Sequence, residues 1–432
     1  MQSLYDIYLK HPEISTDTRS IIPDSIFFSL KGDQFDGNKF AEDALEKGSA
    51  FAVIDNPLYK KDERYILVDD SLLALQNLAQ THRENLDISV IGITGTNGKT
   101  TTKELIAAIL KKKYKTHVTE GNFNNHIGVP LTLLSIKSDI EIAVIEMGAS
   151  HIGEIKLLCR LAMPNYGLIT NIGKAHLQGF GNFDGVLKAK NELYEYISKT
   201  KGKIFLNADN DILRNIANGL SAITYGTDKN AACCGMITES TPYLHIKWKS
   251  GAETSWHNIF SQITGIYNFE NIMSAICIGD YFQVSHSDIC SAINGFVPTN
   301  NRSQLIERKG YSIIKDAYNA NPVSMKAAIM NLSEQHVPNK IAILGDMLEL
   351  GSFSKKEHGR IIKLLESQSF NKVYLVGSLF KNAINNNPYT TFETVEDLIR
   401  FFSTKSNKFP ENSIVLLKGS RGISLEKVLS VI

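Results

Sequence analysis

The sequence predicts an α/β chain with three domains: a small α/β N-terminal domain, a central P-loop-type parallel-sheet domain and a C-terminal Rossmann-like doubly wound domain. Three observations support this fold class. The 432 residues, with 43% apolar content, are enough for two or three separate cores. Strand-length apolar runs alternate with helical stretches from about residue 88 onward. A glycine-rich turn also joins an apolar strand to a helix near residue 95.

The first domain is predicted to span residues 1–85. Its apolar runs at 25–30 and 50–54 are short enough for strands, and the patterns at 40–47 and 72–83 are helical. This mixture predicts a small α/β unit ahead of the glycine-rich turn.

The central domain is predicted to span residues 86–302. Strands are expected at 140–146, 166–170 and 203–206, and a helix is expected to continue through 103–110. Alternating strands and helices predict right-handed βαβ units, and therefore a parallel sheet with helices on both faces.

The third domain is predicted to span residues 303–432 and repeats the doubly wound pattern. The expected strands are 311–315, 340–344, 372–376 and 413–417, and the expected helices are 324–333, 355–366 and 395–402. The polar segment 298–302 is predicted to be a hinge, and 385–388 a loop.

Composition excludes several classes of protein. Lys plus Arg number 46 and Asp plus Glu number 45, so no overall field favours nucleic acid or an anionic membrane. The N-terminal residues do not resemble a secretion signal, and no apolar run is long enough to cross a bilayer. We therefore expect a cytoplasmic protein with small-molecule substrates, no nucleic acid and no membrane partner. The five cysteines lack metal-ligand spacing and are expected to be reduced thiols without chemistry.

The glycine-rich turn predicts a nucleotide phosphate site. Its backbone N–H groups and the following helix N-terminus favour an anion, while Lys99 can reach terminal phosphates and the Thr100 hydroxyl can bind Mg²⁺. The loop is a variant, because Ile93 stands where the general pattern has its first glycine. The predicted ATP-binding residues here are Gly95, Thr96, Asn97, Gly98, Lys99, Thr100 and Thr101.

Two later strand ends carry polar side chains toward the same edge of the predicted sheet. Glu146 ends the strand at 140–146 and is a candidate Mg²⁺ ligand, although such a carboxylate is often only a helix cap. His176 follows the strand at 166–170 and is a second candidate, although a lone histidine is usually structural. From its local sequence alone, Lys190 is an ordinary solvated helix lysine.

Segments along nearly the whole chain resemble the Mur ligases of peptidoglycan synthesis. The resemblance includes the phosphate loop, 119–130, Glu146-Met147-Gly148, 171–181 and 189–192. Further matches lie at 316–322, 344–351 and 418–422, and the segments 15–19 and 27–37 resemble the family's uridine-nucleotide domain. These matches occur in the family's order, so chance is a poor explanation.

The resemblance implies an ATP-dependent ligase that joins D-alanyl-D-alanine to UDP-N-acetylmuramoyl-tripeptide (UDP-MurNAc-tripeptide). ATP would phosphorylate the peptide carboxylate, and the dipeptide amine would attack the acyl phosphate to give the UDP-MurNAc-pentapeptide, ADP and phosphate. Anionic groups must approach one another during this reaction, so cations must cover the site. The resemblance implies two Mg²⁺ ions, with Thr100, Glu146 and His176 as ligands.

The same resemblance assigns a role to Lys190. The matching lysine of Mur ligases is carbamylated by CO₂, which replaces a cation by an anion that can support the second metal. The implied catalytic residues are therefore Lys99, Glu146, His176 and carbamylated Lys190.

For adenosine, the resemblance implies contacts from Asn271, Arg302 and Asp316. Two departures affect this region: Tyr267 stands where the family usually has histidine, and Ala317 where many relatives have serine. The effect of both on ATP binding stays open, and helix-core packing is an alternative role for Asn271.

Substrate-binding residues are predicted in three places. Thr16, Asp17 and Arg19 are expected near the uridine nucleotide, and Arg421 is expected to pair with a dipeptide carboxylate. The remaining candidates are neutral amides, some of which turn formation alone would explain. They are Asn122, Asn124, Asn125, Asn319 and Asn321.

Other functions stay open from the sequence. One is a different Mur-type amino acid ligase or a folylpolyglutamate synthase-like enzyme, which the segment 316–322 and the uridine-like motif disfavour. Another is a nucleotide-gated scaffold without catalysis, which the joint presence of Lys99, Glu146, His176 and Lys190 disfavours. We expect a monomer whose domains rotate when ATP and the nucleotide precursor bind.

Overall fold

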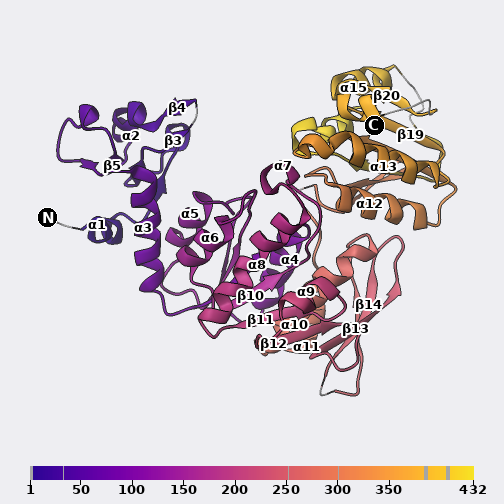
Figure 1. Ribbon diagram of the computed structural model, residues 1–432, viewed down its shortest axis with the longest axis horizontal. Coiled ribbons are helices and arrows are strands. Elements are labelled where there is room, and N and C mark those ends of the chain that lie inside the picture. The colour runs from indigo at the N-terminus through magenta and orange to yellow at the C-terminus, as the bar shows by residue number, and fades with distance from the viewer. Residues whose placement is uncertain (1–2, 33, 252, 300, 384–387, 405–408) are drawn as a thin grey trace.

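The computed structural model describes residues 3–32, 34–251, 253–299, 301–383, 388–404 and 409–432. Its elements form three bodies that follow one another along the chain (Figure 1). The N-terminal body lies at one end, the body with the largest sheet in the middle, and the C-terminal body at the other end. The predicted loop at 385–388 lies outside the described residues, except for Pro388.

The N-terminal body is built on a four-stranded parallel sheet of order β1-β2-β5-β6. The predicted strands and helices are present, because each apolar run fills a core position. Phe28 and Val53 are fully buried in neighbouring strands. The elements are α1 Leu4–Lys10, β1 Ile14–Ser15, η1 Thr18–Ser20, β2 Ile26–Phe28, β3 Lys31–Gly32, β4 Phe35–Asp36, η2 Gly37–Phe40, α2 Ala41–Glu46, β5 Phe51–Ile54, η3 Pro57–Tyr59, β6 Tyr65–Leu67 and α3 Ser71–Glu84.

The central body contains a nine-stranded sheet of order β15-β14-β13-β12-β11-β10-β7-β9-β8. Strands β7 to β13 run parallel, as the alternating pattern predicts. The elements are β7 Ser89–Thr94, α4 Lys99–Leu110, β8 Thr116–Val118, α5 Gly128–Leu134, β9 Ile142–Glu146, α6 Glu154–Ala162, β10 Tyr166–Ile169, α7 Leu177–Phe180, α8 Phe183–Lys199, β11 Lys203–Asn207, α9 Asp211–Ile216, β12 Ala222–Gly226, β13 Cys233–Glu239, β14 His245–Ser250, β15 His257–Phe260, η4 Ile266–Asn268, α10 Phe269–Tyr281 and α11 His286–Asn294.

The last two strands of this sheet differ from the prediction. β14 and β15 pair antiparallel at the sheet edge, whereas the sequence pattern predicts a parallel sheet. These strands carry polar residues on one side, as in half-exposed antiparallel strands, so they lack the continuous apolar runs of the buried parallel ones. Trp248 on β14 is nevertheless fully buried against the helices.

The C-terminal body contains a six-stranded sheet of order β16-β17-β21-β18-β19-β20. Every predicted strand and helix is present, and the pairings are parallel except for the edge strand β16. The elements are β16 Gln304–Arg308, β17 Tyr311–Lys315, α12 Pro322–Glu334, β18 Asn339–Gly345, η5 Gly351–Phe353, α13 Ser354–Glu366, β19 Lys372–Val376, α14 Ser378–Ala383, β20 Thr390–Phe392, α15 Val395–Ser403, β21 Ser413–Lys418, η6 Arg421–Ile423 and η7 Leu425–Ser430.

The order of the central strands positions the site. β7 lies between β9 and β10, with Ile93 opposite Glu146 and Thr94 opposite Ile169. The carboxyl ends of the three strands therefore lie together, and whatever follows each strand faces the same crevice.

The five cysteines are free, four of them buried, as predicted. In the described part of the chain, no helix has the length and apolar character that crossing a bilayer requires.

Candidate active site

The phosphate loop joins β7 to the N-terminus of α4. Gly95 has φ +145° and Gly98 has φ +81°, conformations that other residues rarely adopt. A Cβ on Gly95 would lie 2.0 Å from the Thr170 hydroxyl oxygen, so the loop can lie this close to β10 only with glycine there. The Lys99 ammonium donates to the carbonyl oxygens of Gly95 at 2.7 Å and Thr96 at 3.3 Å. Burial lowers the pKa of Lys99.

Glu146 lies beside this loop at the end of β9, and its side chain is buried. Its carboxylate accepts hydrogen bonds from the Thr100 hydroxyl at 2.9 Å and the Asn124 amide at 2.8 Å. The buried Lys103 ammonium lies 3.9 Å from the same carboxylate. Two of the three predicted metal ligands, Thr100 and Glu146, are therefore in direct contact.

His176 follows β10 and is the N-cap residue of α7, with φ +49°. Its Nδ1 lies 2.6 Å from a carboxylate oxygen of Glu349, which belongs to the C-terminal body. Hydrogen bonding to His176 lowers the pKa of Glu349. Lys174 and Glu357 form a second ion pair across the same boundary, at 3.3 Å. The predicted third metal ligand therefore holds the two bodies together in this conformation.

Lys190 is a buried lysine on α8, which overturns its description as a solvated helix residue. Its ammonium lies 3.5 Å from the Ala149 carbonyl and 5.6 Å from the centre of the Phe180 ring. Burial, with repulsion from Lys99, lowers the pKa of Lys190 to about 7. A lysine with such a pKa is about half free amine at pH 7 and largely free amine above it.

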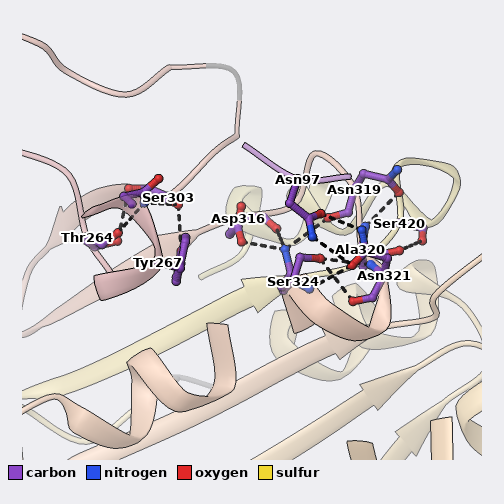
Figure 2. Close-up of polar contacts among 12 residues, drawn as sticks. Asn97, Thr264, Tyr267, Ser303, Asp316, Asn319, Ala320, Asn321, Ser324 and Ser420 are labelled. Carbon is purple, nitrogen blue, oxygen red and sulfur yellow. Dashed lines mark hydrogen bonds and ion pairs between the residues drawn. The ribbon is translucent and has the colours of Figure 1, made fainter. Parts of the chain in front are cut away.

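Polar groups behind the phosphate loop form a second cluster. Asn271 accepts from the Thr102 hydroxyl at 3.0 Å and donates to Asn268 at 2.8 Å. A Cβ on Gly98 would lie 2.4 Å from the Asn271 amide oxygen, so this amide packs directly against the loop. Tyr267 and Ser303 hydrogen-bond through their hydroxyls at 2.9 Å, which attaches η4 to the residue just before β16 (Figure 2).

Two arginines lie near one tyrosine where the central and C-terminal bodies meet. The guanidinium carbon of Arg302 lies 3.7 Å from the centre of the Tyr318 ring, and that of Arg421 lies 5.2 Å from it. The Nε of Arg302 is buried and has no hydrogen-bond partner among the described residues. An unpaired buried N–H is costly, so this group is suited to an acceptor on a ligand.

A buried ion pair lies next to this tyrosine. The Lys418 ammonium lies 2.6 Å from the Asp316 carboxylate and also donates to the Asn319 carbonyl at 3.2 Å. Lys418 is almost fully buried, so the pair fixes the chain after β17 against the end of β21.

The segment after Asp316 ends in a helix cap that touches the phosphate loop. Asn321 accepts from the Ser324 backbone N–H at 2.9 Å as the N-cap of α12, and its amide donates to the Asn97 amide oxygen at 2.7 Å (Figure 2). Asn319 accepts from the Ala320 backbone N–H at 2.8 Å. Asn321 therefore connects the central and C-terminal bodies at the nucleotide loop.

These groups line one cavity of about 710 Å³ between the two bodies. Most of the sequence-predicted residues lie on its wall: Thr96, Asn97, Gly98, Lys99, Thr100, Thr101, Asn122, Asn124, Asn125, Glu146, His176, Asn271, Arg302, Asp316, Asn319 and Asn321. Gly95, Lys190 and Arg421 do not line the cavity themselves. Each lies near a residue that does: Lys99, Ala149 and Tyr318, respectively.

Three predicted substrate residues lie away from this cavity. Thr16, Asp17 and Arg19 are in the N-terminal body, where Asp17 and Arg19 form an exposed ion pair with a 2.6 Å separation. This pairing lowers the pKa of Asp17 to about 2. The residues are on the surface, and the three-body arrangement separates them from the phosphate loop (Figure 1).

Sequence reasoning missed three residues of the site. Glu349 binds His176, Tyr318 contacts both arginines, and Lys418 pairs with Asp316. Tyr318, Glu349 and Lys418 all lie inside segments already noted for their resemblance, and Lys418 directly precedes the turn that contains Arg421. Only proximity in the fold distinguishes them from their neighbours.

Comparison with known proteins agrees with this architecture. The Mur ligase middle domain matches residues 93–279, and the Mur ligase, glutamate ligase domain matches residues 301–421. The UDP-N-acetylmuramoyl-tripeptide–D-alanyl-D-alanine ligase of Bacillus subtilis is 38% identical over 96% of this chain and 92% of its own length.

Solved structures give the same result for the whole chain. MurF from Acinetobacter baumannii superposes with a TM-score of 0.87 at 29% identity, covering 97% of this chain and 92% of that one. MurF ligase from Thermotoga maritima in complex with ADP superposes with a TM-score of 0.85 at 26% identity, covering 98% and 97%.

Proposed function

The chain belongs to the Mur ligase family, and from this premise we propose that it joins D-alanyl-D-alanine to UDP-MurNAc-tripeptide at the expense of ATP. The peptide carboxylate attacks the γ-phosphorus and ADP leaves. The dipeptide amine then attacks the acyl carbon and phosphate leaves, which gives the UDP-MurNAc-pentapeptide precursor of peptidoglycan. One observation carries the proposal: the phosphate loop and Glu146 line a single cavity together with Asp316, Tyr318, Asn319 and Asn321.

The phosphate loop supplies the positive charge that the first step needs. The N-terminus of α4 and the backbone N–H groups after Gly95 favour the triphosphate. The Lys99 ammonium donates to loop carbonyls in this structure and would turn toward the phosphates of a bound nucleotide. Lys99 is partly buried, so its attraction for an anion is screened less than at an open surface.

Thr100 and Glu146 fit a Mg²⁺ ion. An uncharged hydroxyl and a carboxylate in contact are the hard oxygen donors that Mg²⁺ prefers, and both face the cavity. His176 would add a ligand for a second ion through Nε2, since Nδ1 is the ring nitrogen that contacts Glu349. When bound, the two ions would neutralise charge between the triphosphate and the acceptor carboxylate.

Lys190 fits a carbamate. Carbamylation requires a neutral amine, and the lowered pKa of Lys190 supplies one near pH 7. The resulting anion would turn a repulsive neighbour of Lys99 and the metal site into an attractive one. This change removes the electrostatic repulsion between the Lys190 and Lys99 ammonium groups.

The far side of the loop is suited to the adenosine of ATP. Asn271 and Tyr267 line this end of the cavity, and the unpaired Nε of Arg302 lies beside them. Tyr267 keeps a hydrogen-bonding hydroxyl in the place of the family's usual histidine, and it uses that hydroxyl on Ser303. We assign adenine and ribose contacts to Asn271, Arg302 and Asp316.

The UDP-MurNAc-tripeptide and the dipeptide are assigned to different bodies. The amides of Asn122, Asn124 and Asn125 face the cavity from the central body and suit the muramyl peptide. Asn319, Asn321 and Arg421 in the C-terminal body suit the dipeptide, whose carboxylate can pair with the guanidinium. Thr16, Asp17 and Arg19 would hold the uridine nucleotide.

Ligand binding should change the angle between the bodies. The His176–Glu349 and Lys174–Glu357 contacts cross the boundary between the bodies, so a rotation on ligand binding would have to break or rearrange them. The proposal keeps the predicted domain boundaries 1–85, 86–302 and 303–432, a monomeric state and a cytoplasmic location, where ATP is available.

A phosphate-release assay tests the function. The purified chain, ATP, Mg²⁺ and UDP-MurNAc-tripeptide should release phosphate with D-alanyl-D-alanine and much more slowly with single amino acids. Lys99→Ala should lower the rate at least about 100-fold without loss of fold. A preference for a single amino acid would indicate a sister ligase or a folylpolyglutamate synthase-like enzyme. Binding of ATP without acceptor-dependent phosphate release would indicate a scaffold.

A further inference from the structure

A cluster of two histidines and a glutamate lies outside the cavity, at the antiparallel end of the central sheet. Glu253 lies in the turn between β14 and β15, His257 is the first residue of β15, and His286 is the first residue of α11. None of the three lines the active-site cavity. Their side chains are between one quarter and about one third exposed, so solvent can reach the cluster.

The three side chains converge on one point. His257 Nε2 lies 3.0 Å from one carboxylate oxygen of Glu253, and His286 Nδ1 lies 3.3 Å from the other. One ligand atom from each residue can be chosen so that all lie within 4.8 Å of one another. Ligands at bond lengths of about 2.0–2.2 Å around a tetrahedral metal are separated by about 3.3–3.6 Å. Small side-chain rotations would therefore produce a metal site.

His286 has an acceptor on each side of its ring. Its Nε2 lies 2.9 Å from the carboxylate of Asp280, while its Nδ1 faces Glu253. A neutral imidazole carries only one N–H, so it can donate to only one of these two carboxylates. The other ring nitrogen then presents a lone pair to a carboxylate oxygen, which is repulsive unless a proton or a metal cation lies between them.

Asp280 is positioned to select the nitrogen that stays free. Its carboxylate accepts from the Ser250 hydroxyl at 3.0 Å and contacts the Cys233 thiol at 3.5 Å, so it is fixed by β13 and β14. Donation from His286 Nε2 to Asp280 leaves the Nδ1 lone pair directed at Glu253 and His257. A carboxylate behind a histidine is the usual support for a histidine that binds a metal.

Trp248 forms an apolar floor for the two imidazoles. Its ring centre lies 5.1 Å from the ring centre of His257 and 5.1 Å from that of His286. The two imidazole rings are themselves 4.7 Å apart, so two protonated rings would repel each other strongly. A single divalent cation avoids this repulsion and matches the charge of the Glu253 and Asp280 carboxylates.

We propose that Glu253, His257 and His286 bind one Zn²⁺-like transition-metal ion, with Asp280 orienting His286 and water completing the coordination. Two imidazoles and one carboxylate favour Zn²⁺ over Mg²⁺, which prefers oxygen ligands. The ion would attach the β14–β15 turn to the start of α11. The ion's proposed role is to tie these two segments together, which does not depend on the proposed ligase activity.

Metal titration of the full chain tests this proposal. After chelator treatment and dialysis, Zn²⁺ alone is titrated by calorimetry, and Co²⁺ alone is titrated while its visible absorption is recorded. We expect one equivalent that is absent from His257→Ala, His286→Ala and Glu253→Gln, with a Co²⁺ spectrum of tetrahedral intensity. Asp280→Asn should retain the site but weaken affinity about 10–100-fold.

The His245–Glu239 pair provides the matched control. It is a single histidine–carboxylate contact of 2.8 Å between β13 and β14 of the same sheet, so His245→Ala should retain the full equivalent. Zn²⁺ should also raise the thermal unfolding midpoint of wild type and His245→Ala by a few degrees, and leave His257→Ala unchanged. If wild type binds no Zn²⁺, or His257→Ala and His286→Ala bind it as tightly as wild type, the site does not exist. Circular dichroism identifies any variant that has merely unfolded. In that case the test is Asp280→Asn, and a Zn²⁺ affinity equal to wild type would contradict the proposal.

Discussion

Asn97 in the phosphate loop and Asn321 at the start of α12 are joined side chain to side chain, with the Asn321 amide donating to the Asn97 oxygen at 2.7 Å. The two residues are far apart in the sequence and belong to different bodies. Since Asn321 is also the N-cap of α12, the position of the nucleotide loop is linked to the start of a helix in the C-terminal body. The contact gives the cavity one wall from each body.

Replacing Asn321 separates its two roles. Asn321→Ala should cost about 1 kcal/mol of unfolding free energy through loss of the helix cap. Asn321→Ser retains a capping oxygen but cannot reach Asn97, so its unfolding free energy should stay near wild type. Both variants should show the same decrease in kcat/KM for the dipeptide. Urea unfolding and phosphate release measure the two effects, and wild-type kinetics for Asn321→Ser would contradict a role for the Asn97 contact.

Two glycines should respond oppositely to alanine. Gly95→Ala forces a Cβ to 2.0 Å from the Thr170 hydroxyl oxygen at φ +145°, so we expect a loss of more than about 2 kcal/mol and of ATP binding. Gly359 lies within α13, where an added Cβ meets no atom within 4 Å. Gly359→Ala should therefore stabilise the chain by about 0.5–1 kcal/mol and leave catalysis unchanged. Thermal unfolding with and without ATP compares them, and equal effects would contradict this loop geometry.

Glu146→Gln tests the proposed metal site. The amide can still contact Thr100 and Asn124, but it has lost the charge that attracts Mg²⁺. We expect a decrease in kcat of at least about 100-fold and a higher Mg²⁺ requirement, with little change in fold. Titration of activity with Mg²⁺ measures both. Unchanged Mg²⁺ dependence would remove Glu146 from the ligand set.

Lys190 should make activity depend on pH and on bicarbonate. Its pKa of about 7 means that the free amine needed for carbamylation falls about tenfold for each pH unit below 7. Activity should therefore rise from about pH 6 to pH 8, and added bicarbonate should raise it most at the acidic end. Isotopically labelled bicarbonate should give a carbamate signal in wild type and none in Lys190→Ala. Activity of Lys190→Ala equal to wild type would contradict the role.

The same pKa shift predicts how stability changes with pH. Between about pH 7 and pH 10 the unfolded chain keeps the Lys190 proton that the folded chain has lost, so the unfolding free energy rises with pH in this window. Lys190→Met removes this contribution. The variant should be more stable than wild type near pH 6, and its advantage should decrease toward pH 10. Urea unfolding at several pH values checks the sign, and a growing advantage would contradict it.

The order of helices and strands was predictable from local pattern. Apolar runs such as 311–315 and 372–376 form strands at the predicted positions, because burial on both faces of a parallel sheet requires continuous apolar sequence. The antiparallel strands β14 and β15 were not predicted, because one polar side interrupts their apolar pattern. Their hairpin carries Glu253 and His257 of the proposed zinc site. The sequence pattern did not predict these strands, and it did not predict the cluster that they help to form.

The sequence by itself determined the phosphate loop, the strand ends that bear Glu146 and His176, and the family, because these depend on residue types at short spacing. Only the tertiary structure decided that Lys190 is buried, that His176 meets Glu349 and that Asn97 meets Asn321. Each of these facts depends on which distant segments pack together. A lysine's exposure and pKa follow from the neighbours that exclude water, and the chain brings those neighbours close only when it folds.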